Sequence, residues 1–267
     1  MPIASSRLLV AAILVFWLVP GRSEAPPHVV TLAPHLTELV YAVGAENRLV
    51  GVVDYSDYPE AAQALPRIGD AFRFDLERIL TLNADTALAW RGGTPQAVAD
   101  SMTSLGVSVI WIETRTLDDV ASALRAIGSA LSAAEAGDRA ANAFEQALNN
   151  LRASHVPSGS ALDVFYQVSR RPLYTLGGRH LINETLAVCG MVNVFADLDI
   201  EAAVVSREAV VEAAPDLIIA AADAHVDWTD LVLQEMLSAR LVTIDPDLLT
   251  RPSPRILQGI EQLCALR

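Results

Sequence analysis

The chain has 267 residues with a formal net charge of −13, and 52% of its residues are hydrophobic. This length and composition allow two modest domains with buried cores and exclude a disordered protein. All 19 basic residues are arginine and they form no basic stripe, so we expect no nucleic-acid partner.

The first 25 residues predict an export signal. Arg7 provides a positive start, residues 8–19 are apolar, and Ser23-Glu24-Ala25 resembles a cleavage site with small residues on either side. The apolar run is shorter than the ~20 residues of a membrane-spanning helix, so we expect a cleaved secretory signal. A retained membrane anchor is the alternative.

The next part of the chain alternates short apolar runs with amphipathic segments. The predicted strands are 28–32, 49–53, 86–90 and 107–112, and the predicted helices are 36–43, 76–82, 96–105 and 117–131. Residues 55–73 are predicted to be irregular. Strands that alternate with helices predict a mostly parallel sheet covered on both faces.

A longer helix is predicted over residues 133–154, where small or apolar residues recur every three to four positions. The same alternation then returns, with strands at 161–168, 192–195 and 217–221 and helices at 181–188 and 208–213. Two local matches indicate an internal repeat: Glu38, Gly44 and Asn47 match Glu184, Gly190 and Asn193, and Glu77 and Asp85 match Glu208 and Asp216.

These patterns predict an α/β fold of two Rossmann-like lobes, each with a mostly parallel sheet, joined by one long backbone helix. The expected divisions are the signal at 1–25, a first lobe at 26–131, the connecting helix at 132–155 and a second lobe at 156–267. A ligand cleft is expected between the lobes.

No catalytic motif is present: the sequence lacks G-x-S-x-G, a glycine-rich phosphate loop, H-E-x-x-H and C-x-x-C. The five histidines lie in separate elements without ligand spacing. A metal site built from His35, His180 and a carboxylate is an alternative, because the lobes face each other. We expect a protein that is not an enzyme and has no metal or other cofactor.

Aromatic and polar residues gather in loops that would border the cleft. In the first lobe Tyr55, Phe72 and the pair Trp90-Arg91 lie beside predicted strand or helix ends, and Tyr174 and Arg251 take comparable places in the second. Ligands of open α/β sheets bind beyond the carboxyl ends of the strands. Such rings with a few polar groups suit a large, flat organic ligand. The alternative is that the rings pack on their own lobe.

Glu77 and Glu208 each begin a short helix at equivalent positions of the two lobes. A carboxylate there favours the positive end of the helix dipole, which is one explanation. The repeat also places one carboxylate on the same face of each lobe, as docking to arginines of a two-fold symmetric partner requires.

Cys189 and Cys264 are the two cysteines of the chain. In an exported protein they predict a disulfide, which in the chain-entropy model would stabilise the fold by about 4 kcal/mol. Two buried thiols are the alternative.

Several stretches are distinctive: VTLAPHLTELVYAVG, VVDYSDYPEAA, LERILTLNADTALAWRGG, SLGVSVIWIE, NETLAVCG with VNVF, VSREAVVEAAPD, and RPSPRI before the last helix. In these stretches the chain resembles the helical-backbone substrate-binding proteins of ABC importers, and within them the cobalamin-binding branch. YSDYP, AWRGG and the two cysteines are typical of that branch, whereas the LER and SRE glutamates mark the wider class.

The resemblance implies a monomeric periplasmic protein that captures cobalamin or another corrinoid and delivers it to the membrane-spanning subunits of an ABC importer. It implies docking through Glu77 and Glu208 and a disulfide between Cys189 and Cys264. The ligand contacts that it implies are Tyr55, Phe72, Trp90, Arg91, Tyr174, Asp247, Leu248, Leu249, Thr250 and Arg251.

The chain departs from the cobalamin branch at Ala71, Ala202 and Leu248, where that branch carries tryptophan, with Phe72 replacing the first ring. Each aromatic side chain buries roughly 150–250 Å², so the loss weakens the contact unless other groups replace it. A corrinoid precursor, haem, a ferric siderophore or a metal ion therefore stay as alternative ligands. An enzyme acting on a corrinoid is a further alternative that would need a positioned acid, base or nucleophile.

Overall fold

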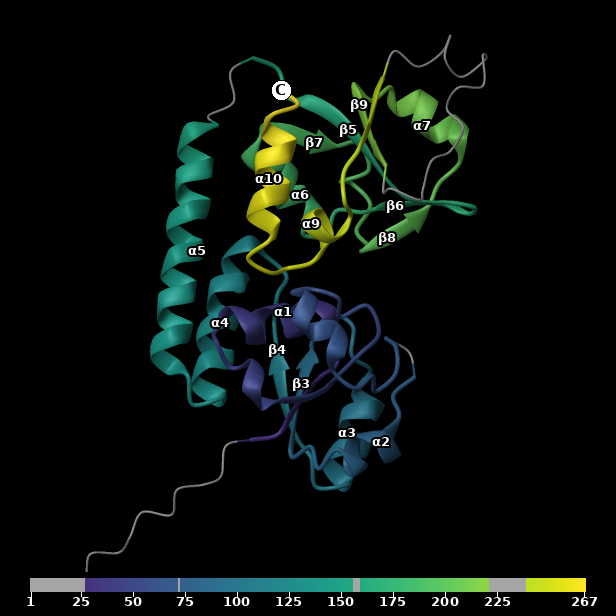
Figure 1. Cartoon of the computed structure of the whole chain (residues 1–267). Helices are drawn as coiled ribbons and strands as arrows, with labels where there is room; N and C mark the ends of the chain where they lie inside the picture. Colours follow the sequence, from purple (N-terminus) through teal and green to yellow (C-terminus); the bar gives the residue numbers. More distant parts are fainter. Residues whose placement is uncertain (1–26, 72, 156–158, 221–238) are drawn as a thin grey trace, which may run out of the picture.

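The structure is a computed structural model that describes residues 27–71, 73–155, 159–220 and 239–267. Two lobes, each built on a β-sheet, follow one another along the molecule, and the long helix α5 (Ala134–Ser154) runs beside both of them (Figure 1). The predicted export signal, residues 1–25, lies outside the described residues. No described helix has the length and apolar character to cross a membrane.

The first lobe has a four-stranded parallel sheet in the order β2-β1-β3-β4. Its strands are β1 (Val29–Thr31), β2 (Leu49–Val52), β3 (Thr86–Trp90) and β4 (Ser108–Ile112). Its helices are α1 (Pro34–Ala42), α2 (Leu76–Thr81), α3 (Gln96–Ser104) and α4 (Leu117–Ala130), with short 3₁₀ turns at Glu46–Arg48 and Glu60–Ala64. The predicted alternation of strands and helices is confirmed. The apolar strand β1 is buried on both faces, as a central strand of a parallel sheet is.

The second lobe has a mixed sheet in the order β10-β9-β5-β6-β8, with β7 paired to β5. Its strands are β5 (Leu162–Arg170), β6 (Leu173–Leu176), β7 (Met191–Asn193), β8 (Ala202–Val204), β9 (Leu217–Ala220) and β10 (Arg240–Thr243). Its described helices are α6 (Ile182–Val188), α7 (Arg207–Ala213), α9 (Asp247–Thr250) and α10 (Ile256–Cys264).

The predicted α/β class is confirmed, and the structure adds strands that the sequence analysis did not assign. Both β6 and β8 are antiparallel to their neighbours, and together they extend one side of the second sheet. Each has only three or four residues, which is too short for an alternating pattern to stand out. β10 was missed for the same reason.

The internal repeat is visible in equivalent contacts. Gly44 and Gly190 follow α1 and α6 with φ angles of 67° and 66°, a left-handed conformation that glycine adopts without strain. Asp85 accepts from the backbone N–H of His28 in front of β1, and Asp216 accepts from that of Asp163 in β5. The two lobes therefore repeat one structural unit.

Helix α5 contacts α4 of the first lobe and α10 of the second. Where α4 and α5 cross, a Cβ on Gly137 would lie 3.0 Å from the Cα of Gly128, so the helices approach to backbone contact. One continuous cluster of buried apolar residues includes Leu124, Phe144 and Leu186, and so extends through both lobes and α5. The two lobes thus share one hydrophobic core and are not independent domains on a flexible linker.

The predicted disulfide is confirmed: Cys189, at the end of α6, is bonded to Cys264, at the end of α10. The closed loop has a sequence separation of 75 residues and lies within the second lobe.

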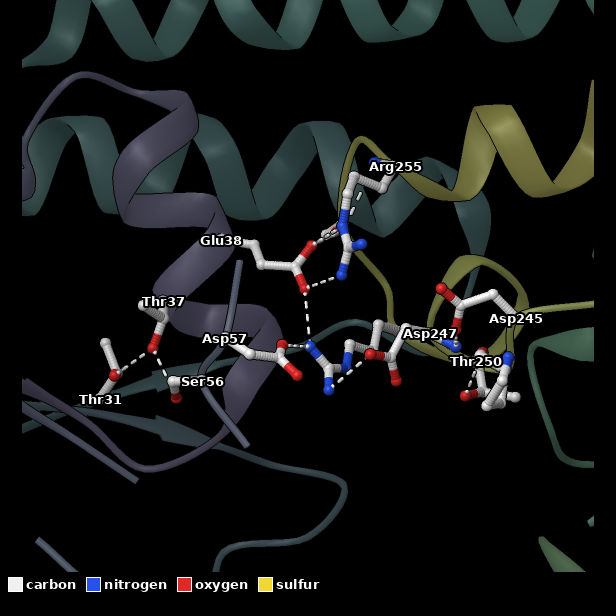
Figure 2. Close-up of polar contacts among 12 residues, drawn as sticks. Thr31, Thr37, Glu38, Ser56, Asp57, Asp245, Asp247, Thr250 and Arg255 are labelled. Carbon is white, nitrogen blue, oxygen red and sulfur yellow. Dashed lines mark hydrogen bonds and ion pairs between the residues drawn. The ribbon is translucent and has the colours of Figure 1, made fainter. Parts of the chain in front are cut away.

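The lobes also meet through a buried carboxylate. Glu38 of α1 points from the first lobe toward Arg255 at the start of α10 (Figure 2). Arg255 donates to both carboxylate oxygens at 2.7 and 2.9 Å, Ser253 donates at 2.6 Å and Arg251 at 3.1 Å. The side chain of Glu38 is only 2% exposed, so this contact lies in a water-poor environment.

A matching contact crosses the boundary in the opposite direction. Glu184 of α6, the repeat equivalent of Glu38, accepts a hydrogen bond of 2.8 Å from the backbone N–H of Leu117, the first residue of α4. A carboxylate at this place also satisfies the positive end of the helix. In each lobe, the glutamate of one helix therefore reaches the start of a helix in the other lobe.

We predict that Glu38→Gln lowers the free energy of unfolding by about 2–4 kcal/mol, because two largely buried guanidinium groups lose their shared anionic acceptor. Urea denaturation measures the change. Glu135→Gln is the matched control, since Glu135 forms an exposed pair with Arg139 and its loss should leave the midpoint nearly unchanged. Equally small effects for both variants would show that the Glu38 cluster does not hold the lobes together.

Candidate functional site

A cleft of about 390 Å³ lies between the lobes, a size typical of small-molecule sites. The first lobe contributes Trp90, the last residue of β3, and residues that follow β3 and β4, at the carboxyl ends of these parallel strands. The second lobe contributes the loop before α6, the segment before β8 and the loop after α9. The lining residues are Trp90, Arg91, Gly92, Glu113, Thr114, Arg115, Arg179, His180, Leu181, Glu201, Thr250 and Pro252.

Trp90 forms a fixed aromatic wall of this cleft. A Cβ on Gly92 or Gly93 would lie 2.6 or 2.5 Å from the indole ring, so the ring packs directly on the backbone of these two glycines. Any larger side chain at either position would displace the ring. The sequence A-W-R-G-G is thus explained by the space that the indole needs.

His35 also packs against Trp90. Its ring packs edge-on against the indole, with a centroid separation of 5.0 Å and an interplanar angle of 81°. Burial, assisted by the charge of Arg251, lowers the pKa of His35 to about 3, so the ring is neutral at physiological pH. A neutral, buried imidazole in contact with Thr114 at 3.5 Å is a packing partner for Trp90.

Charged groups surround the mouth of the cleft. On the first lobe the carboxylate oxygens of Glu113 lie 3.8 Å from Nε of Arg91 and 3.9 Å from Nε of Arg115. The guanidinium of Arg91 also stacks over the ring of Trp111. On the second lobe Arg179 forms a paired contact with Asp199 at 2.7 and 2.9 Å. The two contacts of Glu113 are long and solvent-exposed, so the terminal nitrogens of these arginines can donate to a ligand.

Arg251 lies beside the cleft in a cluster of carboxylates. In addition to Glu38, it contacts Asp57 of the first lobe and Asp247 of α9, each at 2.8 Å. Burial alone would lower the pKa of Arg251, but the hydrogen bonds and charges of these carboxylates outweigh it and raise the pKa. Its neighbours Thr250 and Pro252 line the cleft, whereas the guanidinium of Arg251 bridges the two lobes. The role of Arg251 as a ligand contact therefore stays a prediction.

The same cluster lowers the pKa of Asp57. Partial burial would raise this pKa, but the hydrogen bond and charge of Arg251 outweigh the effect. A lowered pKa means that the contribution of Asp57 to stability is present at neutral pH and is lost as the pH falls through that pKa. The contact across the lobes is therefore complete at neutral pH.

Tyr55 lies in the same loop as Asp57 of this cluster. Its side chain is 77% exposed and its φ angle is 64°, a conformation that is unusual for a tyrosine. Residues held in such sparsely populated backbone conformations cluster at functional sites. Two residues further on, Asp57 anchors the loop to Arg251.

The other predicted contacts are distributed differently. Tyr174 lies on β6 opposite Val204 of β8, partly exposed but outside the lining of the cleft. Leu248 and Leu249 are buried in α9. Phe72 lies outside the described residues. The structure thus brings Trp90, Arg91 and Thr250 together, and the remaining predicted contacts stay predictions.

The cleft contains residues that the sequence analysis did not single out, among them Glu113, Arg115 and Arg179, and it contains His180, which entered only as part of the alternative metal site. Glu113 and Arg115 come just after a predicted strand. They could have been found from the tendency of ligands to bind beyond the carboxyl ends of strands. Arg179 and His180 precede a predicted helix but follow the unassigned strand β6. In the described part of the chain, no three His, Cys, Asp or Glu residues gather in a way that would hold a metal ion.

Glu77 and Glu208 occupy equivalent places. Each is the second residue of its helix, α2 or α7, and each helix is capped by the side chain in front of it, Asp75 or Ser206. Both glutamates are exposed. In Figure 1 the two helices lie on the opposite side of the molecule from α5, one in each lobe.

The chain matches known proteins along most of its length. Residues 29–243 match the family model described as periplasmic binding protein. The chain is 35% identical to vitamin B12-binding proteins of Vibrio cholerae, over 88% of this chain and 87% of the relative, and of Yersinia pestis, over 95% and 91%.

Solved structures show the same architecture. The crystal structure of the periplasmic vitamin B12-binding protein of Vibrio cholerae matches with a TM-score of 0.82 at 35% identity and covers 90% of this chain and 96% of that one. A periplasmic heme-binding protein from Roseiflexus matches with a TM-score of 0.79, but its 23% identity shows the fold alone. The chain belongs to the periplasmic binding protein family.

Proposed function

We propose that this protein captures cobalamin or a related corrinoid in the cleft between its lobes and delivers it to an ABC importer. The observation that carries the proposal is the 35% identity to vitamin B12-binding proteins over nearly the whole chain. Membership of the periplasmic binding protein family supports a periplasmic location, and the predicted export signal would direct the chain there. We propose that the protein acts as a monomer and without a resident cofactor.

The cleft has the chemistry that a corrinoid needs. A corrin is a large, flat macrocycle with apolar faces and a rim of amide side chains, so it favours aromatic surfaces with hydrogen-bond donors around them. Trp90 supplies a rigid ring, and Arg91, Arg115 and Arg179 supply donors at the mouth. Binding of this kind makes and breaks no covalent bond, so the proposal assigns no catalytic residue.

Titration calorimetry with cyanocobalamin, haemin and a ferric siderophore tests the proposal. We expect saturable binding of cyanocobalamin with one ligand per chain. Binding of haemin or the siderophore with no binding of the corrinoid would contradict it. The heme-binding structures at 21–24% identity support a shared scaffold and do not favour haem as the ligand.

We predict that Trp90→Ala weakens cyanocobalamin binding by at least about tenfold, because the ligand loses its rigid aromatic wall. Calorimetry measures the affinity, and thermal unfolding verifies that the variant is folded. Tyr41→Ala is the control, since Tyr41 is a partly buried ring of α1 outside the lining of the cleft. Unchanged affinity of the folded Trp90 variant would rule out this residue as a ligand contact.

We further propose that Glu77 and Glu208 dock the protein onto arginines of the membrane-spanning subunits. The support is their equivalent, exposed placement at the start of α2 and α7, with no ion pair inside the described chain. Capping of these helices does not need the glutamates, because Asp75 and Ser206 already accept the N–H groups of the first turn.

The double variant Glu77→Ala/Glu208→Ala is expected to bind cyanocobalamin with unchanged affinity and to abolish uptake in a reconstituted transport assay. Docking would lose both charge-assisted contacts, whereas the cleft is untouched. Glu135→Ala/Glu261→Ala removes two exposed carboxylates from α5 and α10 and should transport normally. Normal uptake by the first double variant would exclude the docking role.

A further inference from the structure

His180 lies in the second-lobe wall of the cleft, just before α6. Its Nδ1 accepts a hydrogen bond of 3.0 Å from the backbone N–H of Ile182. Its own carbonyl accepts from the side-chain amide of Asn183 at 2.8 Å. Both the ring and the backbone of His180 are therefore held in place by the first turn of the helix.

The contact with Ile182 determines where the ring carries its proton. A backbone amide can only donate, so Nδ1 is unprotonated and the proton of the neutral ring is on Nε2. Burial lowers the pKa of His180 to about 4, which keeps the ring neutral at physiological pH. Nε2 has no hydrogen-bond partner among the described residues and is not one of the enclosed, unpaired polar atoms, and His180 lines the cleft.

A ring in this state is poorly suited to bind a metal through Nε2. Ligation needs the lone pair of that nitrogen, so the proton would have to move to Nδ1. Nδ1–H would then face the N–H of Ile182, and two donors would oppose each other at 3.0 Å. The other histidine near the cleft, His35, packs behind Trp90 and contacts Thr114.

We propose that His180 uses its Nε2–H to donate a hydrogen bond to an amide carbonyl on the rim of the bound macrocycle and does not ligate its metal. This inference rests on the proposed corrinoid function and assigns a specificity-determining residue to it. A neutral donor recognises uncharged amide arms without demanding a negative charge. In this role His180 would supply no ligand to the metal of the macrocycle.

Two variants separate the roles of the two ring nitrogens. His180→Asn keeps an oxygen that can accept from the N–H of Ile182, as Asx turns do, but loses the donor that reaches the cleft. His180→Gln carries a side-chain amide that reaches about as far as Nε2 and can donate from there. His155→Asn is the matched control, because His155 ends α5 away from the cleft.

Calorimetry with cyanocobalamin tests the hydrogen bond. We expect His180→Asn to weaken binding about three- to tenfold, the loss of one hydrogen bond. His180→Gln should recover most of the affinity, and His155→Asn should match the wild type. Unchanged affinity of the folded His180→Asn variant would overturn the proposal.

The visible spectrum of diaquacobinamide, a corrinoid with exchangeable water on its metal, tests the second part. We expect no shift of its corrin bands when it binds the wild-type protein. A shift that His180→Asn abolishes would show ligation and overturn the proposal. A wild-type protein that binds neither corrinoid would contradict the proposed function itself, and this inference with it.

Discussion

The buried carboxylate of Glu38 is the interaction on which the geometry of the cleft depends. Removing a charge from water is costly, and it is tolerated here because Arg251, Ser253 and Arg255 all donate to it. All three donors belong to the other lobe. Moving the lobes apart would therefore break all of these hydrogen bonds to Glu38. The shared apolar core and the unbroken helix α5 oppose the same movement.

A fixed pair of lobes gives a cleft that exists before the ligand arrives. Trp90 is held by two glycines and by His35, and His180 is held by the first turn of α6, so little side-chain entropy is left to lose on binding. The same frame sets the distance between α2 and α7. In the proposed function, an importer would recognise this fixed distance between two glutamates.

Local patterns predicted much of the fold and part of the site. The buried parallel strands and α5 have clear periodicities, and Trp90 was found because ligands bind where strands end. The strands β6 and β8 were missed, because three or four residues are too few for an alternating pattern to stand out. The setting of Arg251 was also hidden, since Glu38 and Asp57 are 213 and 194 residues away. The tautomer of His180 follows from a single backbone contact that no pattern reveals.

Crystal structures with and without cyanocobalamin test directly whether the two lobes keep a fixed arrangement. If the lobes are held by the Glu38 cluster and α5, the two structures will differ by a small lobe rotation, and Arg255 will contact Glu38 in both. A large rotation that separates Glu38 from Arg255 in the free protein would show that the Glu38 cluster and α5 do not fix the arrangement of the lobes.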